Sequence, residues 1–192
     1  MKNSFILVAF CLFSGCLVAQ DSKHEIRLGA GIWSTTEIVN IFGDVVATGL
    51  TDGLYKSDNA TYSGAFHLGY KYSTSERIAI GGTFVYENSS SDAYFNNELS
   101  GRFKNNYYTL AAEMDCNYVK KKFFSLYGVL GAGATLYGQK YTADGKDYSD
   151  NMIGFNYQFS PLCIKLGSKI GGFAELGFGY KGILCVGIFT RF

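Results

Sequence analysis

Apolar residues alternate with small or polar residues along most of this chain, and this period of two is the feature that most limits its fold. Successive side chains of a β-strand point to opposite faces, so the period predicts strands with two unlike faces. The pattern recurs in eight stretches: 24–33, 61–72, 77–87, 108–118, 123–136, 153–166, 173–180 and 183–192. With 24 glycines, 15 tyrosines, 16 phenylalanines and one proline in 192 residues, the composition favours a single all-β domain over a helical bundle.

The charged residues of these stretches share one face. That face carries glycine, alanine and serine together with Glu25, Arg27, Lys71, Arg77, Glu87, Glu113, Asp115, Glu175 and Arg191. The opposite face is aromatic and aliphatic, with Tyr108, Tyr180 and Phe192 near strand ends, as in the aromatic girdles of membrane barrels. A soluble barrel turns its apolar face inward and a membrane barrel turns it outward, so the alternation of apolar and polar residues alone allows both kinds of barrel. The girdle and an export signal favour an eight-stranded antiparallel up-and-down transmembrane β-barrel.

The export signal occupies residues 1–20. Lys2 supplies a positive charge, an apolar run spans residues 5–13, and Leu17-Val18-Ala19 forms a small-residue cleavage site. An uncleaved membrane helix is the alternative, but Ser14-Gly15 interrupts the run, which is short for a span. Ser14-Gly15-Cys16 also resembles a lipoprotein cleavage box, with Phe13 where leucine is usual, which leaves lipidation of Cys16 open. The mature domain, 21–192, keeps 16 basic and 16 acidic residues, and this balance argues against a nucleic-acid partner.

A closing hairpin ends the chain. Two alternating stretches flank Lys181-Gly182, and the second ends at Phe192. This hairpin resembles the last two strands of bacterial outer-membrane β-barrel proteins, in which a terminal aromatic residue is an assembly signal. Residues 24–192 as a whole resemble small eight-stranded outer-membrane proteins of the OmpA and OmpX kind. The resemblance implies the outer membrane of a Gram-negative bacterium, periplasmic termini, contact with lipid and lipopolysaccharide, and recognition of the strand ending at Phe192 by the barrel-assembly machinery.

The connections alternate in length, as expected of such a barrel. Short turns at 73–76, 120–122 and 167–169 are expected at one end, and polar loops at 34–60, 88–105 and 137–150 at the other. Ser34 and Glu37 form a capping box before apolar residues at helical spacing, which predicts a short helix in the first extracellular loop. Its position is left open among the barrel mouth, the outer leaflet and a partner. Pro161 predicts a bulge or register change within the sixth strand.

Charges inside so narrow a barrel must neutralise one another. We expect Glu113 and Glu175 to be partnered by some of Arg27, Lys71 and Arg77. The charges at strand ends, Glu25, Glu87 and Arg191, are expected to be solvated separately. Because eight-stranded barrels are filled by their own side chains, we expect no open pore.

No catalytic, cofactor-binding or metal site is predicted. Some eight-stranded outer-membrane proteins are lipid A deacylases with a His-x-Ser arrangement on the lipid face, whereas His67 is followed by Leu68-Gly69 and points into the lumen, beside Ser63 and Lys71. His24 lies at the beginning of the mature chain, and both histidines are interpreted as structural. Two other groups of candidate residues are not predicted to be sites. The cysteines of the mature domain, Cys116, Cys163 and Cys185, are isolated from one another, and the acidic cluster of Asp144, Asp147 and Asp150 lacks the spacing of a calcium-binding loop.

These patterns predict a non-catalytic integral outer-membrane protein with a structural, envelope or surface-interaction role. Two alternatives belong to other classes. One is a barrel enzyme acting on lipid A, and the other is a secreted lipocalin-like lipid carrier, which would turn the aromatic face inward.

Overall fold

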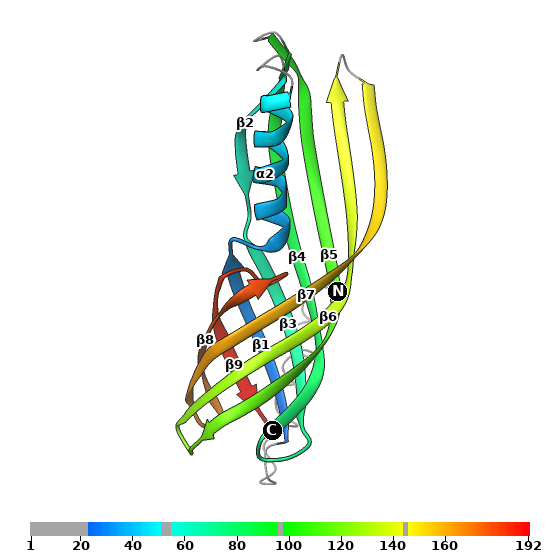
Figure 1. Ribbon diagram of the computed structural model, residues 1–192. Coiled ribbons are helices and arrows are strands. Elements are labelled where there is room, and N and C mark those ends of the chain that lie inside the picture. The colour runs from blue at the N-terminus through cyan, green and yellow to red at the C-terminus, as the bar shows by residue number, and fades with distance from the viewer. Residues whose placement is uncertain (1–22, 51–54, 96–97, 144–145) are drawn as a thin grey trace, which may run out of the picture.

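The computed structural model describes residues 23–50, 55–95, 98–143 and 146–192. Within these ranges the chain is all-β apart from one helix (Figure 1). The elements in chain order are β1 (His24–Ile32), α2 (Thr35–Leu50), β2 (Tyr55–Tyr62), β3 (Ala65–Ser73), β4 (Ile78–Phe95), β5 (Glu98–Lys120), β6 (Phe124–Ala143), β7 (Lys146–Gly167), β8 (Ile170–Gly179) and β9 (Leu184–Arg191).

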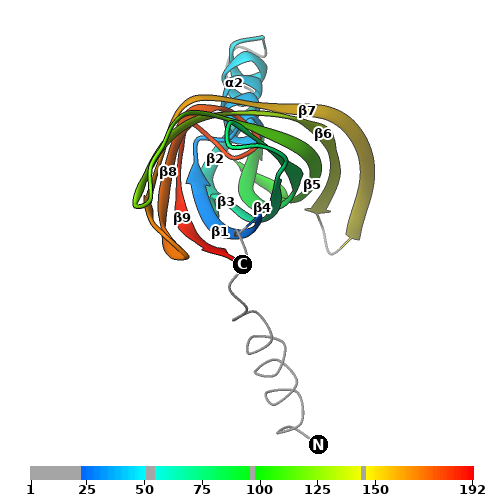
Figure 2. The same cartoon turned by 90° about the horizontal axis from the view of Figure 1, so that it is seen from below.

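Eight antiparallel strands close into a barrel, as predicted. The pairing runs β4-β3-β1-β9-β8-β7-β6-β5 and returns from β5 to β4 (Figure 2). β2 is not a ninth strand of the barrel wall. It lies above β3, to which Ser63-Gly64 connects it, and Gly64 has a φ of +76°. The first and last strands meet in register from Glu25↔Arg191 to Ile32↔Leu184. His24 and Phe192 exchange both backbone hydrogen bonds, at 3.0 and 2.9 Å, so the closing hairpin seals the barrel.

The barrel is apolar outside and charged inside. Aliphatic and aromatic residues such as Leu28, Phe66 and Leu110 are exposed on its outer surface, whereas Arg27, Lys71 and other charged residues are buried within. A lipocalin-like carrier requires the opposite arrangement. The outer surface is therefore one that matches lipid, with the backbone groups paired around the ring.

Among the described residues, no helix is long and apolar enough to cross a membrane.

Four strands are much longer than predicted. β4, β5, β6 and β7 have 18, 23, 20 and 22 residues, whereas about 9–11 suffice to cross a bilayer. The expectation of polar loops at 88–105 and 137–150 was wrong, because most of these residues extend the strands above the ring. Together with β2, the segments 88–95, 98–107, 137–143 and 146–157 form a sheet that rises on one side of the barrel (Figure 1). We call this sheet the platform.

The predicted helix is present and has 16 residues. Its capping box is formed as expected: Ser34 Oγ accepts from the Glu37 N–H at 3.0 Å, and a Glu37 carboxylate oxygen accepts from the Ser34 N–H at 3.3 Å. Thr35 Oγ1 lies 3.1 Å from Asn156 Oδ1, and Asn40 donates to the Tyr107 hydroxyl at 2.6 Å. These contacts place the first turns of α2 at the mouth of the barrel, beside the platform.

The two irregular positions in the last strands were partly predicted. The β7–β8 register shifts between Phe159 and Leu162, which confirms the irregularity expected at Pro161. The closing turn includes Gly182, at a φ of +95°, as the tight hairpin requires. Tyr180, however, is buried in the lumen rather than on the lipid face. Gly179, at a φ of +146°, breaks the alternation just before it.

Candidate functional site: a platform above a charged lumen

The lumen holds a connected group of ion pairs. Arg27 contacts Asp115, and it also lies 2.5 Å from Glu25 and 3.2 Å from Glu175. Lys71 lies 2.9 Å from Glu113 and 2.7 Å from Asp115. The predicted partnership of Arg27 and Lys71 with the inner carboxylates is therefore confirmed.

Two lysines of this group were not predicted. Lys165 lies 2.8 Å from Glu25 and 3.4 Å from Asp115, and Lys181 lies 2.5 Å from Glu175 and 3.2 Å from Glu113. Lys165 stands between the exposed residues Ile164 and Leu166, and this alternation could have predicted that it faces the lumen. The bulge at Pro161 interrupts the alternation just before it, so the signal was missed. For Lys181 there was no such signal, because a turn lysine is ordinarily solvated and here its long side chain reaches back into the barrel.

The expectations for Arg77 as a lumen partner and for separate solvation of the charges near the strand ends were wrong. Arg77 is exposed in the turn before β4 and belongs to no ion pair described here. Glu25 is buried and accepts from Arg191 at 2.7 Å, so neither residue is separately solvated. Glu87 is also buried, and the Ser34 hydroxyl donates to its carboxylate at 2.8 Å. The narrow barrel thus gathers even the charges near its rims.

Aromatic side chains complete the filling of the lumen. The hydroxyl of Tyr127 donates to Glu175 at 2.8 Å, and that of Tyr180 donates to Glu113 at 2.8 Å. Gly131 makes room for this second contact, because a Cβ there would lie 2.1 Å from the Tyr180 oxygen. Glycine on the inner face is therefore a packing requirement at this position.

His67 is buried in the lumen, as predicted, but with different neighbours. Its Nε2 lies 3.1 Å from the Cys185 sulfur, and its ring lies 5.8 Å from that of Phe173. Ser63 is exposed and bonds to backbone groups instead. A thiol beside an imidazole is a nucleophile-base arrangement, but both side chains are buried within the packed barrel, which favours a structural role.

The acidic cluster is only partly described. Asp144 lies outside the described residues, and Asp150 is exposed, with its carboxylate accepting from the Asn151 N–H at 2.8 Å. Within the described ranges no group of three or more candidate ligands is arranged to hold a metal ion. The thiols of Cys116, Cys163 and Cys185 are free.

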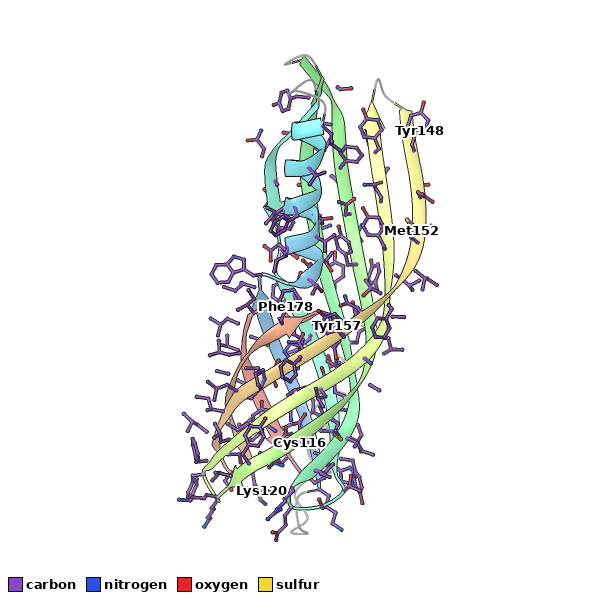
Figure 3. The ribbon with its side chains drawn as sticks, in the orientation of Figure 1. Cys116, Lys120, Tyr148, Met152, Tyr157 and Phe178 are labelled. Carbon is purple, nitrogen blue, oxygen red and sulfur yellow. The ribbon has the colours of Figure 1, made fainter. Side chains whose placement is uncertain are left out.

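One edge of the platform has no neighbouring strand among the described residues. β7 pairs with β6 from Lys146 onward in the sequence, but it pairs with β8 only from Gln158 onward. Segment 146–157, which we call the β7 edge, therefore has one side without a neighbouring strand, and only at its end does the Tyr157 carbonyl accept from the Tyr180 N–H, at 3.1 Å. The exposed side chains of Tyr148 and Met152 stand above the barrel, whereas Tyr157 at the lower end of the segment lies beside Phe178 of β8 (Figure 3).

The backbone of the β7 edge is capped at two positions. The Asn151 N–H donates to Asp150 at 2.8 Å, and the Tyr157 N–H donates to Asn156 at 2.9 Å. These N–H groups therefore point to the open side, and by the alternation of an antiparallel strand that of Ile153 does too. Such local caps are one way in which edge strands limit indiscriminate pairing.

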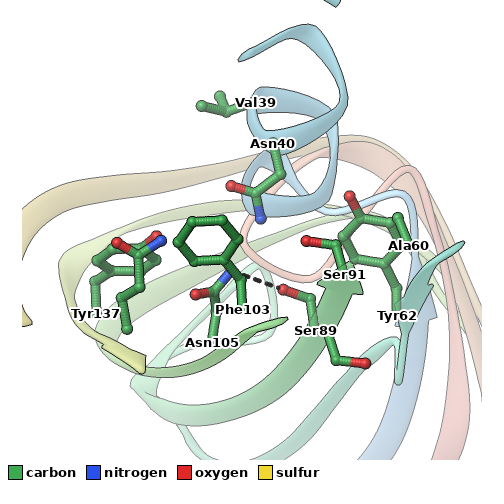
Figure 4. Close-up of a pocket in the computed structure, with 11 residues that line it drawn as sticks. Val39, Asn40, Ala60, Tyr62, Ser89, Ser91, Phe103, Asn105 and Tyr137 are labelled. Atoms are coloured by element: carbon green, nitrogen blue, oxygen red, sulfur yellow. Dashed lines mark hydrogen bonds between the residues drawn. The ribbon is translucent and has the colours of Figure 1, made fainter. Parts of the chain in front are cut away.

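The inner face of the platform is polar and mostly uncharged, although Asp150 lies on it as the cross-strand partner of Gln139. The parity of this face continues that of the lumen, but serine, asparagine, glutamine and tyrosine replace most of the charges. Between this face and α2 lies a pocket of about 300 Å³ (Figure 4). Burial, the neighbouring Tyr107 and the negative charge of Asp150 raise the pKa of Tyr137 to about 12, so this phenol is uncharged at neutral pH.

Comparison with known proteins gives a fold-level likeness only. No protein-family model matches the chain, and no curated protein matches it. A solved structure of Ail, the attachment invasion locus protein of Yersinia pestis, in complex with the heparin analogue sucrose octasulfate, shares 16% identity with this chain. The match covers 88% of this chain and 96% of the Ail chain, at a TM-score of 0.45. A second Ail structure from Yersinia pestis also shares 16% identity, covering 88% and 95% at a TM-score of 0.42. The strand pairing described above, and not this likeness, defines the fold.

Proposed function

We propose that this protein is a non-catalytic integral outer-membrane protein of a Gram-negative bacterium with a surface-interaction role, and that the platform is the interacting part. The observation that carries the proposal is the β7 edge. An open strand with exposed apolar side chains, held above a membrane-type barrel, is suited to receive an extended segment of another protein by β-strand addition. Soluble domains ordinarily shorten, cover or charge such an edge, whereas here the charged residues, Lys146, Asp147 and Asp150, are confined to its first five positions.

Targeting and orientation belong to the same proposal. Residues 1–20 are a cleaved signal and residues 21–192 are the mature barrel domain, with both termini in the periplasm. The barrel-assembly machinery recognises the strand ending at Phe192, and outer-membrane lipid and lipopolysaccharide surround the apolar surface. The position of the paired residues His24 and Phe192 at the end with the short turns, opposite the platform, supports this orientation.

The same proposal includes a filled lumen and the absence of catalytic, cofactor-binding and metal sites. Buried ion pairs and the packed Tyr127 and Tyr180 side chains support a lumen without an open pore. The burial of His67 and Cys185 supports their structural interpretation. No described residue pair offers the lipid-facing His-x-Ser arrangement of the deacylase alternative.

The β7 edge can be tested with a peptide library displayed on phage and panned against the barrel in nanodiscs. Ile153→Pro removes an outward N–H without disturbing the bonds to β6, whereas Ile153→Val keeps that donor and a similar side chain. We expect the wild type and Ile153→Val to enrich the same extended peptides. Ile153→Pro should bind them about tenfold more weakly, as expected for loss of an interfacial hydrogen bond together with ring clash. Equal binding by all three proteins, or no enrichment, would refute strand addition.

A further inference from the structure

The pocket between α2 and the platform has a composition that selects one ligand class. Hydroxyl and amide groups of Ser89, Ser91, Asn105 and Gln139 line it together with the rings of Phe103 and Tyr137 (Figure 4). None of the described residues that line it is charged. An anionic ligand would therefore lose hydration here without a cationic partner in the lining, which is costly, and Asp150 beside Gln139 would repel it.

The polar groups of the pocket can both donate and accept hydrogen bonds. Serine hydroxyls and the side-chain amides of asparagine and glutamine each provide donors and acceptors within a few ångströms of one another. A ligand that satisfies them needs closely spaced groups of the same dual kind. The hydroxyls of a neutral sugar have this property, whereas an apolar ligand would leave the amides without partners.

The two aromatic residues provide fixed apolar surfaces beside these polar groups. Phe103 packs against Tyr141 with ring centroids 4.6 Å apart, and Tyr137 packs against Tyr107 at 5.0 Å. Both rings are therefore held by a neighbour on the adjoining strand. A sugar ring has apolar C–H faces as well as polar edges, so it matches a pocket that combines fixed aromatic rings with hydroxyls and amides.

Asn105 supplies a second, independent observation. Asn105 is 8% exposed, and its side-chain amide nitrogen donates to Ser89 Oγ at 3.3 Å. Its Oδ1 is buried and has no hydrogen-bond donor among the described residues. In Figure 4 this oxygen points away from Ser89, to the side of the pocket on which Tyr137 lies. An acceptor left without a donor destabilises the protein, and a ligand hydroxyl would remove that cost.

We propose that this pocket binds a neutral saccharide of one or two sugar rings, with Asn105 Oδ1 accepting from a sugar hydroxyl. The volume of about 300 Å³ lies at the small end of ligand pockets, which fits a ligand of this size. The proposal deepens the surface role proposed above, since it needs the platform to face the outside of the cell. It does not need the β7 edge.

The test uses full-length mature protein refolded from inclusion bodies into lauryldimethylamine-oxide micelles, which contain no sugar. Saturation-transfer NMR titrations with galactose, N-acetylglucosamine, lactose and maltose measure binding, with N-acetylneuraminic acid as the anionic comparison. Asn105→Ala removes the acceptor that has no donor, and Ser91→Trp fills the pocket while Asn105 itself is kept. Asn117→Ala is the matched control, because Asn117 lies on the same strand near the short turns. A heat-modifiable gel band verifies the folding of each variant.

We expect at least one neutral saccharide to bind the wild type and Asn117→Ala equally. Asn105→Ala should weaken that binding about tenfold, and Ser91→Trp should abolish it. The proposal is overturned if no neutral saccharide binds, if both pocket variants bind like the wild type, or if N-acetylneuraminic acid binds as tightly. Saccharide binding that survives Ile153→Pro, while peptide enrichment is lost, would separate this site from the β7 edge.

Native mass spectrometry distinguishes the source of the sugar. A saccharide mass on protein extracted from outer membranes, and its loss in Asn105→Ala, would assign the ligand to the envelope of the cell itself. Extracted protein without such a mass, together with binding of added saccharide by refolded protein, would assign it to the surroundings. Both results support saccharide binding in the pocket, and they differ only in the source of the saccharide.

Discussion

Asp115 is the residue on which the lumen most depends. It is 0% exposed and contacts three cations from three different strands: Arg27, Lys71 and Lys165. Removing a buried charge from water costs several kcal/mol, and only close partners offset that cost. Asp115 therefore holds β1, β3 and β7 to β5 across the barrel, through side chains rather than through the backbone ladder.

Replacing Asp115 with asparagine should lower the free energy of unfolding by about 3–5 kcal/mol, because three buried cations lose a charged partner while the side-chain shape is kept. Urea unfolding in lipid vesicles, followed by the fluorescence of Trp33, measures the difference. Asp150→Asn is the control, since Asp150 is exposed on the platform. If the two variants unfold at the same urea concentration, the buried pairs do not stabilise the barrel.

At the scale of strands and helices, the sequence predicted the barrel ring better than the platform above it. β1 begins and ends within one residue of its predicted range, because one face is the apolar outer surface of the barrel and the other lines the lumen. Above the ring both faces meet water, so the period of two in apolarity disappears. Pairing continues all the same, through cross-strand partners such as Ser89↔Asn105 and Tyr107↔Tyr137. Polarity was therefore mistaken for a loop at 88–105 and 137–150.

The candidate site shows the same division. The helix was predicted because its capping box is a local signal, read from Ser34 and Glu37 alone. The pocket was not predicted, because it forms only when Asn105 and Tyr137 on two platform strands meet α2. Contacts between segments far apart in sequence leave no periodic pattern. The β7 edge was missed for a related reason, since its open side depends on how early β8 ends.

At the scale of the whole molecule, the barrel separates a sealed lower part from an open upper part. In the lower part ion pairs, tyrosines and close-packed glycines occupy the interior. We expect purified protein in planar lipid bilayers to give no steady ohmic conductance, because no continuous water column is expected through this packing. An unrelated porin reconstituted in the same lipids serves as the positive control. Stable open steps with the present protein would contradict a filled lumen.

The asymmetry between the two ends also predicts how the molecule crosses the membrane. The short turns and the paired residues His24 and Phe192 lie at one end, and the platform lies at the other, so outward presentation of the platform places the turns in the periplasm. Single cysteines test this in a variant whose Cys116, Cys163 and Cys185 are replaced by alanine. A membrane-impermeant maleimide should label Ser100→Cys on the platform in intact cells, and Ser75→Cys in a turn only after the outer membrane is permeabilised. Both positions are exposed, so the difference reports sidedness rather than burial. Labelling in the reverse order would place the platform in the periplasm and remove the basis for a surface role.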